Sequence, residues 1–176
     1  MSASLRGRLL RGVLFLVVLG FLFGTALRGK GAGPLTEGPA PDFTLQLFDG
    51  EAISLEELRD EIVMINFWAA WCVYCRDETP ILERSWQAYK DKGVTFIGVN
   101  WMDVESEAQK YLLEFAITYP NGPDLGSRIG HAYGVQGVPE AYIVDREGNL
   151  AYTQIGPLDE ATLVGVLDSL LDQPHQ

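Results

Sequence analysis

Two cysteines, Cys72 and Cys75, are the residues of this sequence best suited to covalent chemistry. They are its only cysteines, and two residues separate them, so one helical turn brings their sulfurs within bonding distance. Such a dithiol can exchange with a disulfide: one thiolate attacks, a mixed disulfide forms, and the other thiolate resolves it. We assign the attack to Cys72, nearer the exposed end of the helix, and the resolution to Cys75.

The elements that must position these cysteines are a strand and a helix. Residues 62–68 form a short apolar run that suits a buried strand, and a helix is predicted from near Val73 to Lys92. Cys72 then lies at the N-terminus of the helix, where unpaired N–H groups and the helix dipole stabilise a thiolate. A lowered thiol pKa raises the fraction of nucleophile near neutral pH, so this junction predicts redox chemistry.

Two other roles for the cysteines are weaker hypotheses. A purely structural disulfide over so short a loop would constrain the unfolded chain little. A zinc site needs about four ligands, and the only histidines are His131 and His175, singly placed and far along the chain. We therefore expect no metal and no cofactor other than the redox-active dithiol.

Strands alternate with helices along the rest of the chain and end in a hairpin, which predicts an α/β fold with a mixed central sheet flanked by helices. Ser54 and Glu57 fit a capping box that opens a short helix, and Asp159 fits the N-cap of the last helix. The expected strands are 43–47, 62–68, 94–101, 141–145 and 150–155; the expected helices are 73–92, 105–117, 127–133 and 160–171, with a loop at 119–124.

Two prolines lie where they could shape the site. Pro80 falls inside the predicted helix, where a kink would let the first turn present the cysteines. Val138-Pro139 precedes a predicted strand and is either an ordinary turn or a cis peptide. A cis peptide facing the disulfide would expose backbone groups that could pair with a substrate strand.

Residues from about 39 to 172 resemble the thioredoxin superfamily. The matching features, in order and spacing, are the W-C-x-x-C junction, the helix proline Pro80, the segment Gly137-Val138-Pro139, and the final hairpin and helix. The resemblance implies a thioredoxin-like fold and a cis peptide at Pro139. It also implies that Trp71, Val138, Pro139 and Glu140 contact the substrate.

Within the superfamily, the chain is similar to the exported TlpA/ResA/CcmG branch. The opening segment from Pro39 to Leu45 with Asp49-Gly50 is typical of that branch and is shared with peroxiredoxins. Glu140 directly after Pro139 is most similar to the members that act in cytochrome c maturation. The likeness implies a reductase whose substrate is the oxidised C-x-x-C-H haem-attachment site of apocytochromes c. It also implies a membrane electron donor of the CcdA/DsbD type.

Two carboxyl groups near the cysteines, those of Glu78 and Glu140, are candidates for proton transfer. The buried aspartate that thioredoxin has before its cysteines corresponds to Asn66, and asparagine cannot take a proton. Glu78, one turn after Cys75, is the candidate replacement: if buried, it would have a raised pKa and could accept the proton of Cys75. The alternative for Glu78 is a solvated helix residue. Three roles are open for Glu140: it could relay protons, contact the substrate, or simply be a charge on the surface.

The N-terminal part differs in charge from the rest. Residues 1–33 hold five of the thirteen basic residues and none of the 24 acidic ones, so the remainder carries a formal net charge of −16. This acidity excludes a nucleic-acid partner, which needs a basic patch. The apolar run in residues 1–27, with arginines before it, predicts a transmembrane anchor or, alternatively, a cleaved signal peptide. Either one exports the domain, predicted at 39–176 after a linker at 28–38.

The leading hypothesis is therefore a protein-disulfide reductase, anchored by one helix in the cytoplasmic membrane with its domain on the outer face. The enzymatic alternatives are a general exported reductase, an oxidase or isomerase, and a thiol peroxidase. The peroxidase is weakest, because the peroxidatic T-x-x-C pattern is absent before Cys72. A non-enzymatic chaperone or binding module is the alternative from another class.

Overall fold

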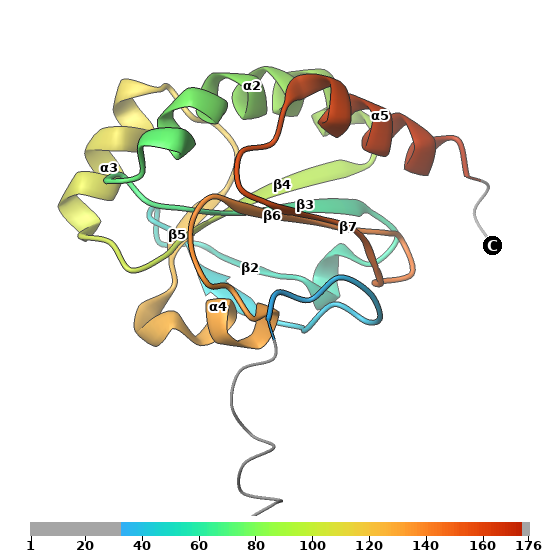
Figure 1. The fold of residues 1–176 in the computed structure, drawn as a ribbon, viewed down its shortest axis with the longest axis horizontal. Helices are drawn as coiled ribbons and strands as arrows, with labels where there is room; N and C mark the ends of the chain where they lie inside the picture. The colour runs from blue at the N-terminus through green and yellow to red at the C-terminus, as the bar shows by residue number, and fades with distance from the viewer. Residues whose placement is uncertain (1–32, 174–176) are drawn as a thin grey trace, which may run out of the picture. The chain divides into compact units, whose positions relative to one another are not determined.

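A five-stranded mixed sheet runs through residues 33–173, the part of the chain that this computed structural model describes (Figure 1). The strand order is β5-β4-β3-β6-β7. The strands are β3 (Ile62–Trp68), β4 (Val94–Asn100), β5 (Asn121–Pro123), β6 (Glu140–Val144) and β7 (Leu150–Ile155). β3 pairs in parallel with β4 and antiparallel with β6. The predicted thioredoxin-like α/β fold with a mixed sheet is confirmed.

Helices cover both faces of this sheet, which is why the central strands are mostly apolar. Figure 1 shows α2 (Val73–Tyr89) and α5 (Glu160–Leu171) on one face and α4 (Arg128–Tyr133) on the other. All seven residues of β3 are buried. Its successive side chains point to opposite faces, so Met64 packs under α2 and α5 while Ile65 packs on the α4 side.

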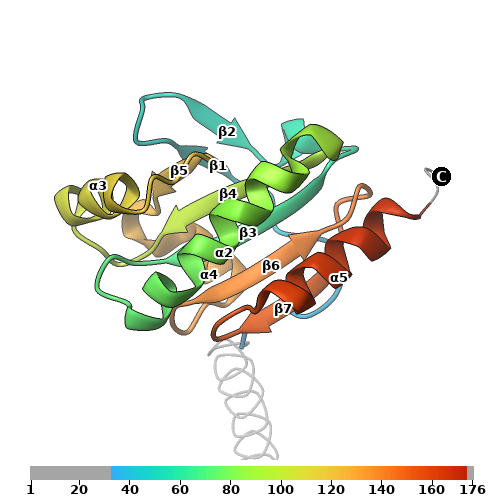
Figure 2. The same cartoon turned by 90° about the horizontal axis from the view of Figure 1, so that it is seen from above.

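The helix α3 (Glu105–Glu114) follows β4 and lies at the β5 edge of the sheet rather than over its middle (Figure 2). Ala108 and Tyr111 are its buried residues, and they pack with Trp68, Cys72 and Cys75 in one apolar cluster. The junction of β3 and α2 is therefore enclosed on one side by α3.

Short 3-10 segments and caps account for the helix ends. α2 ends at Tyr89, and a 3-10 turn, Lys90–Lys92, completes the stretch that the sequence predicted as one helix. α3 ends at Glu114, three residues earlier than predicted. α5 begins as predicted, because the carboxylate of Asp159 accepts a hydrogen bond of 2.9 Å from the backbone N–H of Thr162.

The predicted capping box at Ser54 is wrong. Ser54 ends the short strand β2 (Ala52–Ser54), which pairs antiparallel with β1 (Thr44–Gln46) in a separate two-stranded sheet. The helix that follows is a 3-10 turn of three residues, and no side chain caps it. The hairpin across Asp49-Gly50 therefore takes Ser54 into its strand, and no helix long enough to need a capping box follows.

β5 was predicted as a loop, because Asn121–Pro123 has Gly and Pro at two of its three positions. It is a strand because it pairs in parallel with the end of β4, with Gly98 opposite Asn121. Tertiary pairing overrides a local composition that favours a turn.

The described residues begin at Gly33, so the end of the predicted linker can be placed. Leu35 donates a backbone hydrogen bond of 3.0 Å to the carbonyl of Tyr133, and its own carbonyl accepts one of 2.8 Å from the hydroxyl of Thr153. The predicted anchor at 1–27 lies outside the described residues. Within residues 33–173, none of the helices is both long enough and apolar enough to cross a bilayer.

Candidate active site

Cys72 and Cys75 form a disulfide at the start of α2, with their Cα atoms 5.3 Å apart. Cys72 is the N-cap residue, in extended conformation, and its sulfur accepts a hydrogen bond of 3.1 Å from the backbone N–H of Cys75. That N–H is one of the donors that a helix N-terminus leaves unpaired. In the reduced protein the same donor would face the Cys72 sulfur, so the prediction of a stabilised thiolate rests on this helix N-terminus.

The two cysteines differ in their surroundings. Cys75 is fully buried beneath the first turn of α2, whereas Cys72 retains 4% exposure and lies between two exposed residues, Trp71 and Val73. An incoming disulfide therefore approaches Cys72 from the helix end. The assignment of attack to Cys72 and resolution to Cys75 is consistent with this geometry.

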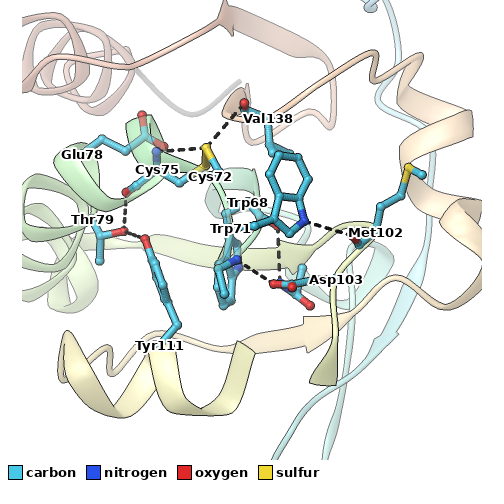
Figure 3. Close-up of a disulfide and its surroundings, with 12 residues drawn as sticks. Trp68, Trp71, Cys72, Cys75, Glu78, Thr79, Met102, Asp103, Tyr111 and Val138 are labelled. Atoms are coloured by element: carbon cyan, nitrogen blue, oxygen red, sulfur yellow. Dashed lines mark hydrogen bonds between the residues drawn. A yellow bond between two sulfur atoms is a disulfide. The ribbon is translucent and has the colours of Figure 1, made fainter. Parts of the chain in front are cut away.

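The loop before β6 faces the disulfide. The peptide bond between Val138 and Pro139 is cis, as the resemblance implied. The carbonyl oxygen of Val138 lies 3.5 Å from the sulfur of Cys72 (Figure 3). In the disulfide this sulfur has no proton to donate, but a reduced Cys72 thiol would have one. The cis peptide therefore lies beside Cys72, as the sequence predicted for a cis peptide at Val138-Pro139 that faces the disulfide.

Glu140 is buried, so its interpretation as a surface charge is wrong. One carboxylate oxygen accepts from the backbone N–H groups of Gln136 and Gly137, at 3.0 and 3.2 Å. The other accepts from the hydroxyl of Tyr142 at 2.8 Å. Both oxygens are therefore engaged within the protein, and together they fix the loop that carries Val138.

Glu78 is also buried, at 3% exposure, so its interpretation as a solvated helix residue is wrong. It lies one turn after Cys75 on α2 (Figure 3). Burial raises the pKa of Glu78 to about 7, against the opposing effect of the Leu158 N–H, which donates to one carboxylate oxygen at 3.0 Å. The other oxygen has no hydrogen-bond partner among the described residues. Glu78 therefore has the burial and the pKa of a proton acceptor near neutral pH.

Asn66 occupies the middle of β3, on the face that α2 covers, and is buried. Its side-chain oxygen has no hydrogen-bond partner in the part of the chain that the structure describes. Since an amide does not titrate, Glu78 is the buried side chain near the sulfurs that can exchange a proton in this pH range.

Thr79 and Tyr111 are site residues that the sequence did not reveal. The hydroxyl of Thr79 donates to the carbonyl of Cys75 at 2.7 Å and is hydrogen-bonded to the hydroxyl of Tyr111 (Figure 3). The ring of Tyr111 stacks on Trp68 at 4.6 Å between centroids. A threonine inside a helix and a tyrosine on an apolar helix face carry no catalytic signal in a sequence. Only their convergence on Cys75 identifies them.

The loop after β4 holds the segment before Cys72. The carboxylate of Asp103 accepts from the backbone N–H of Ala70 at 2.6 Å, and the indole N–H of Trp71 donates to the carbonyl of Met102 at 3.1 Å (Figure 3). Asp103 is in turn held by the side-chain amide of Asn100 at 2.8 Å. These two contacts could not be predicted from the sequence, because their partners are 33 and 31 residues apart.

The remaining candidates lie away from the sulfurs or outside the described residues. His131 is exposed on α4, and His175 lies outside the described residues. Among residues 33–173, no group of three or more His, Cys, Asp or Glu side chains is placed to hold a metal ion. Pro80 lies inside α2, as predicted.

Comparison with known proteins gives relatives that cover most of this chain. The sequence model of the AhpC/TSA family matches residues 36–153. The thiol:disulfide interchange protein HelX of Rhodobacter capsulatus is 38% identical over 150 residues, which are 84% of this chain and 78% of HelX. The thiol:disulfide interchange protein DsbE of Allochromatium vinosum is 34% identical over 164 residues, 90% of this chain and 89% of DsbE.

A solved structure of a protein with the same kind of name has a similar fold. The crystal structure of a thiol:disulfide interchange protein of the thioredoxin family from Chlorobium tepidum TLS matches with a TM-score of 0.71 and 26% identity. The match covers 80% of this chain and 98% of that one.

The fold and the cysteine pair at its strand–helix junction define a thioredoxin-like disulfide oxidoreductase whose active centre is the dithiol. The chain belongs to the AhpC/TSA family, and it is a thiol–disulfide oxidoreductase of the DsbE/ResA/CcmG type.

Proposed function

We propose that the Cys72–Cys75 dithiol reduces disulfides in exported proteins, and that the oxidised C-x-x-C-H haem-attachment site of apocytochromes c is its substrate. The observation that carries the proposal is the pairing of Cys72, 4% exposed at a helix N-terminus, with a fully buried Cys75 one turn from Glu78. The resemblance of Glu140 after Pro139 to cytochrome c maturation members supports the substrate.

The reaction transfers two electrons to the substrate in two exchanges. The Cys72 thiolate attacks one sulfur of the substrate disulfide, which forms a mixed disulfide and releases the other substrate sulfur as a thiolate that takes a proton. The Cys75 thiol then loses its proton and attacks the Cys72 sulfur. The Cys72–Cys75 disulfide forms, and the second substrate sulfur leaves as a thiolate and is protonated.

Glu78 is the proton acceptor for Cys75 in this scheme. Its carboxylate is buried on the same helix, one turn away, and a pKa of about 7 leaves it partly ionised at neutral pH. An acceptor is needed because Cys75 is fully buried, where solvent water does not reach its thiol. Trp71, Val138, Pro139 and Glu140 bind or position the substrate segment.

The oxidised protein must be reduced again, and we assign this to a dithiol donor in the membrane, of the CcdA/DsbD type. Residues 1–27 tether the chain to the cytoplasmic membrane through a single helix, and residues 28–38 link it to a domain of residues 39–176 on the outer face. The uncharged apolar run between basic flanks supports this topology. A tether raises the effective concentration of the domain near a membrane donor.

The proposal is tested with the reduced full chain and an oxidised peptide that contains C-x-x-C-H. We expect one peptide disulfide reduced for each chain oxidised, measured by mass spectrometry after alkylation. A Cys75→Ser chain should accumulate the mixed disulfide with the peptide, whereas a Cys72→Ser chain should form none.

Three of the alternatives, an oxidase, a thiol peroxidase and a binding module, give different results in this experiment or in a close variant of it. An oxidase would leave the oxidised peptide unreacted, and its disulfide form would oxidise the reduced peptide. A thiol peroxidase would be oxidised by hydrogen peroxide faster than by the peptide. Full function of a Cys72→Ala chain would indicate a non-enzymatic binding module.

A further inference from the structure

Large apolar side chains that are exposed to solvent gather near the redox centre. The described residues include eight of them, and three belong to the C-x-x-C segment: Trp71, Val73 and Tyr74. Two more, Met102 and Val104, lie on the loop after β4 and are 64% and 62% exposed. A cluster of exposed apolar residues is costly in water and marks an interaction surface.

The loop of Met102 and Val104 is fixed against the segment that precedes Cys72. Trp71 adjoins Cys72 in the chain, and its indole donates to the carbonyl of Met102 (Figure 3). Asp103, between the two apolar residues, accepts from the N–H of Ala70. The loop therefore stays next to the nucleophile, and its exposed side chains are available to whatever molecule reacts there.

Neither Met102 nor Val104 is of a residue type that is preferred at its position in the backbone. Met102 has φ = 49°, the left-handed region in which Gly and Asn are preferred. Val104 is the N-cap residue of α3 and makes no capping hydrogen bond with its side chain, although Ser, Thr, Asp and Asn are preferred there. Both residues are exposed and apolar, and both depart from the residue types that favour local stability, only two positions apart in the chain. This indicates that they are kept for function.

We propose that Met102 and Val104, beside Trp71, form a docking surface for a large apolar side chain next to the target cysteine of the substrate. This inference rests on the proposed function, and it adds the chemistry by which the site selects among disulfides. The partner is an extended segment of the oxidised protein.

The position of the substrate argues for this occupant. The target sulfur must reach the Cys72 sulfur, which has the carbonyl of Val138 on one side. The substrate chain therefore crosses the site between the loop that carries Val138 and the β4–α3 loop. Residues next to the target cysteine then lie over the exposed surface of Trp71, Met102 and Val104. The flexible thioether of Met102 can adapt to apolar side chains of different shapes. The net charge of −16 on residues 34–176 disfavours an acidic segment.

The test compares two oxidised peptides with the same C-x-x-C-H loop, one with leucine and one with serine next to the first cysteine. The readout is the ratio of kcat/KM for the leucine peptide to that for the serine peptide. We expect the wild-type full chain to favour leucine by about tenfold. Met102→Asn combined with Val104→Thr should bring the ratio close to one.

The two substitutions remove apolar surface while suiting the backbone. Asparagine tolerates the left-handed region, and threonine nearly matches valine in shape and can cap α3. The double variant should therefore keep or raise the melting temperature, by about 2–4 °C, while its preference is lost. Leu113→Gln is the matched control, because Leu113 is also exposed and apolar but lies near the other end of α3. It should leave the ratio unchanged.

A wild-type ratio near one, or a double variant that keeps the wild-type ratio, would overturn the docking surface. A dimeric wild-type chain that the double variant makes monomeric would also overturn it, because a second copy would then be the occupant. The same comparison comes from an exchange equilibrium, in which the Cys72 thiol of Cys75→Ser chains displaces glutathione from single-cysteine forms of the two peptides, each supplied as its mixed disulfide with glutathione. That equilibrium does not depend on the direction of electron flow, so a failure of the proposed reductase function is separable from a failure of the docking surface.

Discussion

At the scale of single residues, the chemistry depends on two groups buried under the first turn of α2. Cys75 must lose a proton to resolve the mixed disulfide, and Glu78 is the nearby side chain with a pKa of about 7. The raised pKa has a simple cause, because burial disfavours the ionised carboxylate and only one N–H, from Leu158, compensates it. The same burial makes Glu78 useful for proton transfer and costly for stability.

Glu78→Gln should slow the resolution step and remove its pH dependence. In the wild-type chain this step should accelerate as the pH rises through about 7, because Glu78 accepts a proton only when it is ionised. We expect the variant to be slower by at least about tenfold at pH 8, measured as decay of the mixed disulfide in single-turnover experiments. Asp77→Asn removes the exposed neighbouring carboxylate as a control. A pH profile in the variant that matches the wild type would exclude Glu78 as the acceptor.

The same substitution should stabilise the oxidised protein at alkaline pH. Above pH 4.5, unfolded Glu78 loses its proton while folded Glu78 keeps it up to about pH 7, so wild-type stability falls across this window. Glutamine removes that loss. The free energy of unfolding should be higher in the variant by as much as about 3 kcal/mol at pH 8, and similar to the wild type at pH 4. Denaturant unfolding at both pH values measures the difference; equal stabilities at pH 8 would contradict the raised pKa.

The sequence predicts some of these residues better than others. Spacing and local order predict Cys72 and Cys75, whereas the cis peptide at Pro139 is predicted by the resemblance to the thioredoxin superfamily. Glu78 and Glu140 were named, but their burial could not be known, because it depends on packing between elements distant in the sequence. Leu158, which holds Glu78, is 80 residues away.

At the scale of elements, the site depends on a hydrogen bond that joins the ends of two strands. Trp68, the last residue of β3, donates its indole N–H to the side chain of Asn121 on β5 at 2.8 Å, across β4. Gly98 on β4 makes room for this bond, since a Cβ there would lie 1.7 Å from the Asn121 side-chain oxygen. The bond fixes the strand end from which the cysteine segment begins.

Gly98→Ala should therefore destabilise the protein by about 2 kcal/mol and lower its activity, because the added methyl group displaces Asn121 from Trp68. Thermal unfolding and the peptide reduction rate measure the two effects. Gly165→Ala is the control: it lies in α5 with open space around its Cβ position and should stabilise slightly. An unchanged melting temperature in Gly98→Ala would show that the Trp68–Asn121 bond is not needed.

The elements themselves were predictable where their patterns are long. β3 was predicted with its observed bounds, because its apolar run lies between two covered faces. β5 was not predicted, and the β1–β2 hairpin was predicted only in part. Three-residue strands show too little periodicity to be recognised, and they are stabilised by pairing with their neighbours.

At the scale of the whole molecule, we propose an acidic redox domain that is exported, tethered to the membrane and reduced by a membrane thiol donor. The predicted anchor and the first part of the linker lie outside the described residues, so these remain predictions from the charge and apolar pattern of residues 1–38. The redox domain matches thiol:disulfide interchange proteins in sequence and in fold.

The direction of electron flow is the central claim, and the equilibrium reduction potential of the Cys72–Cys75 pair tests it most directly. Dithiol proteins of this kind range from about −270 mV for reductants to about −120 mV for strong oxidants. The full chain, equilibrated in glutathione or dithiothreitol redox buffers and assayed by alkylation, should lie near the reducing end. A potential near −120 mV, on the order of that of a strong oxidant, would contradict the account and make the protein an oxidase or isomerase.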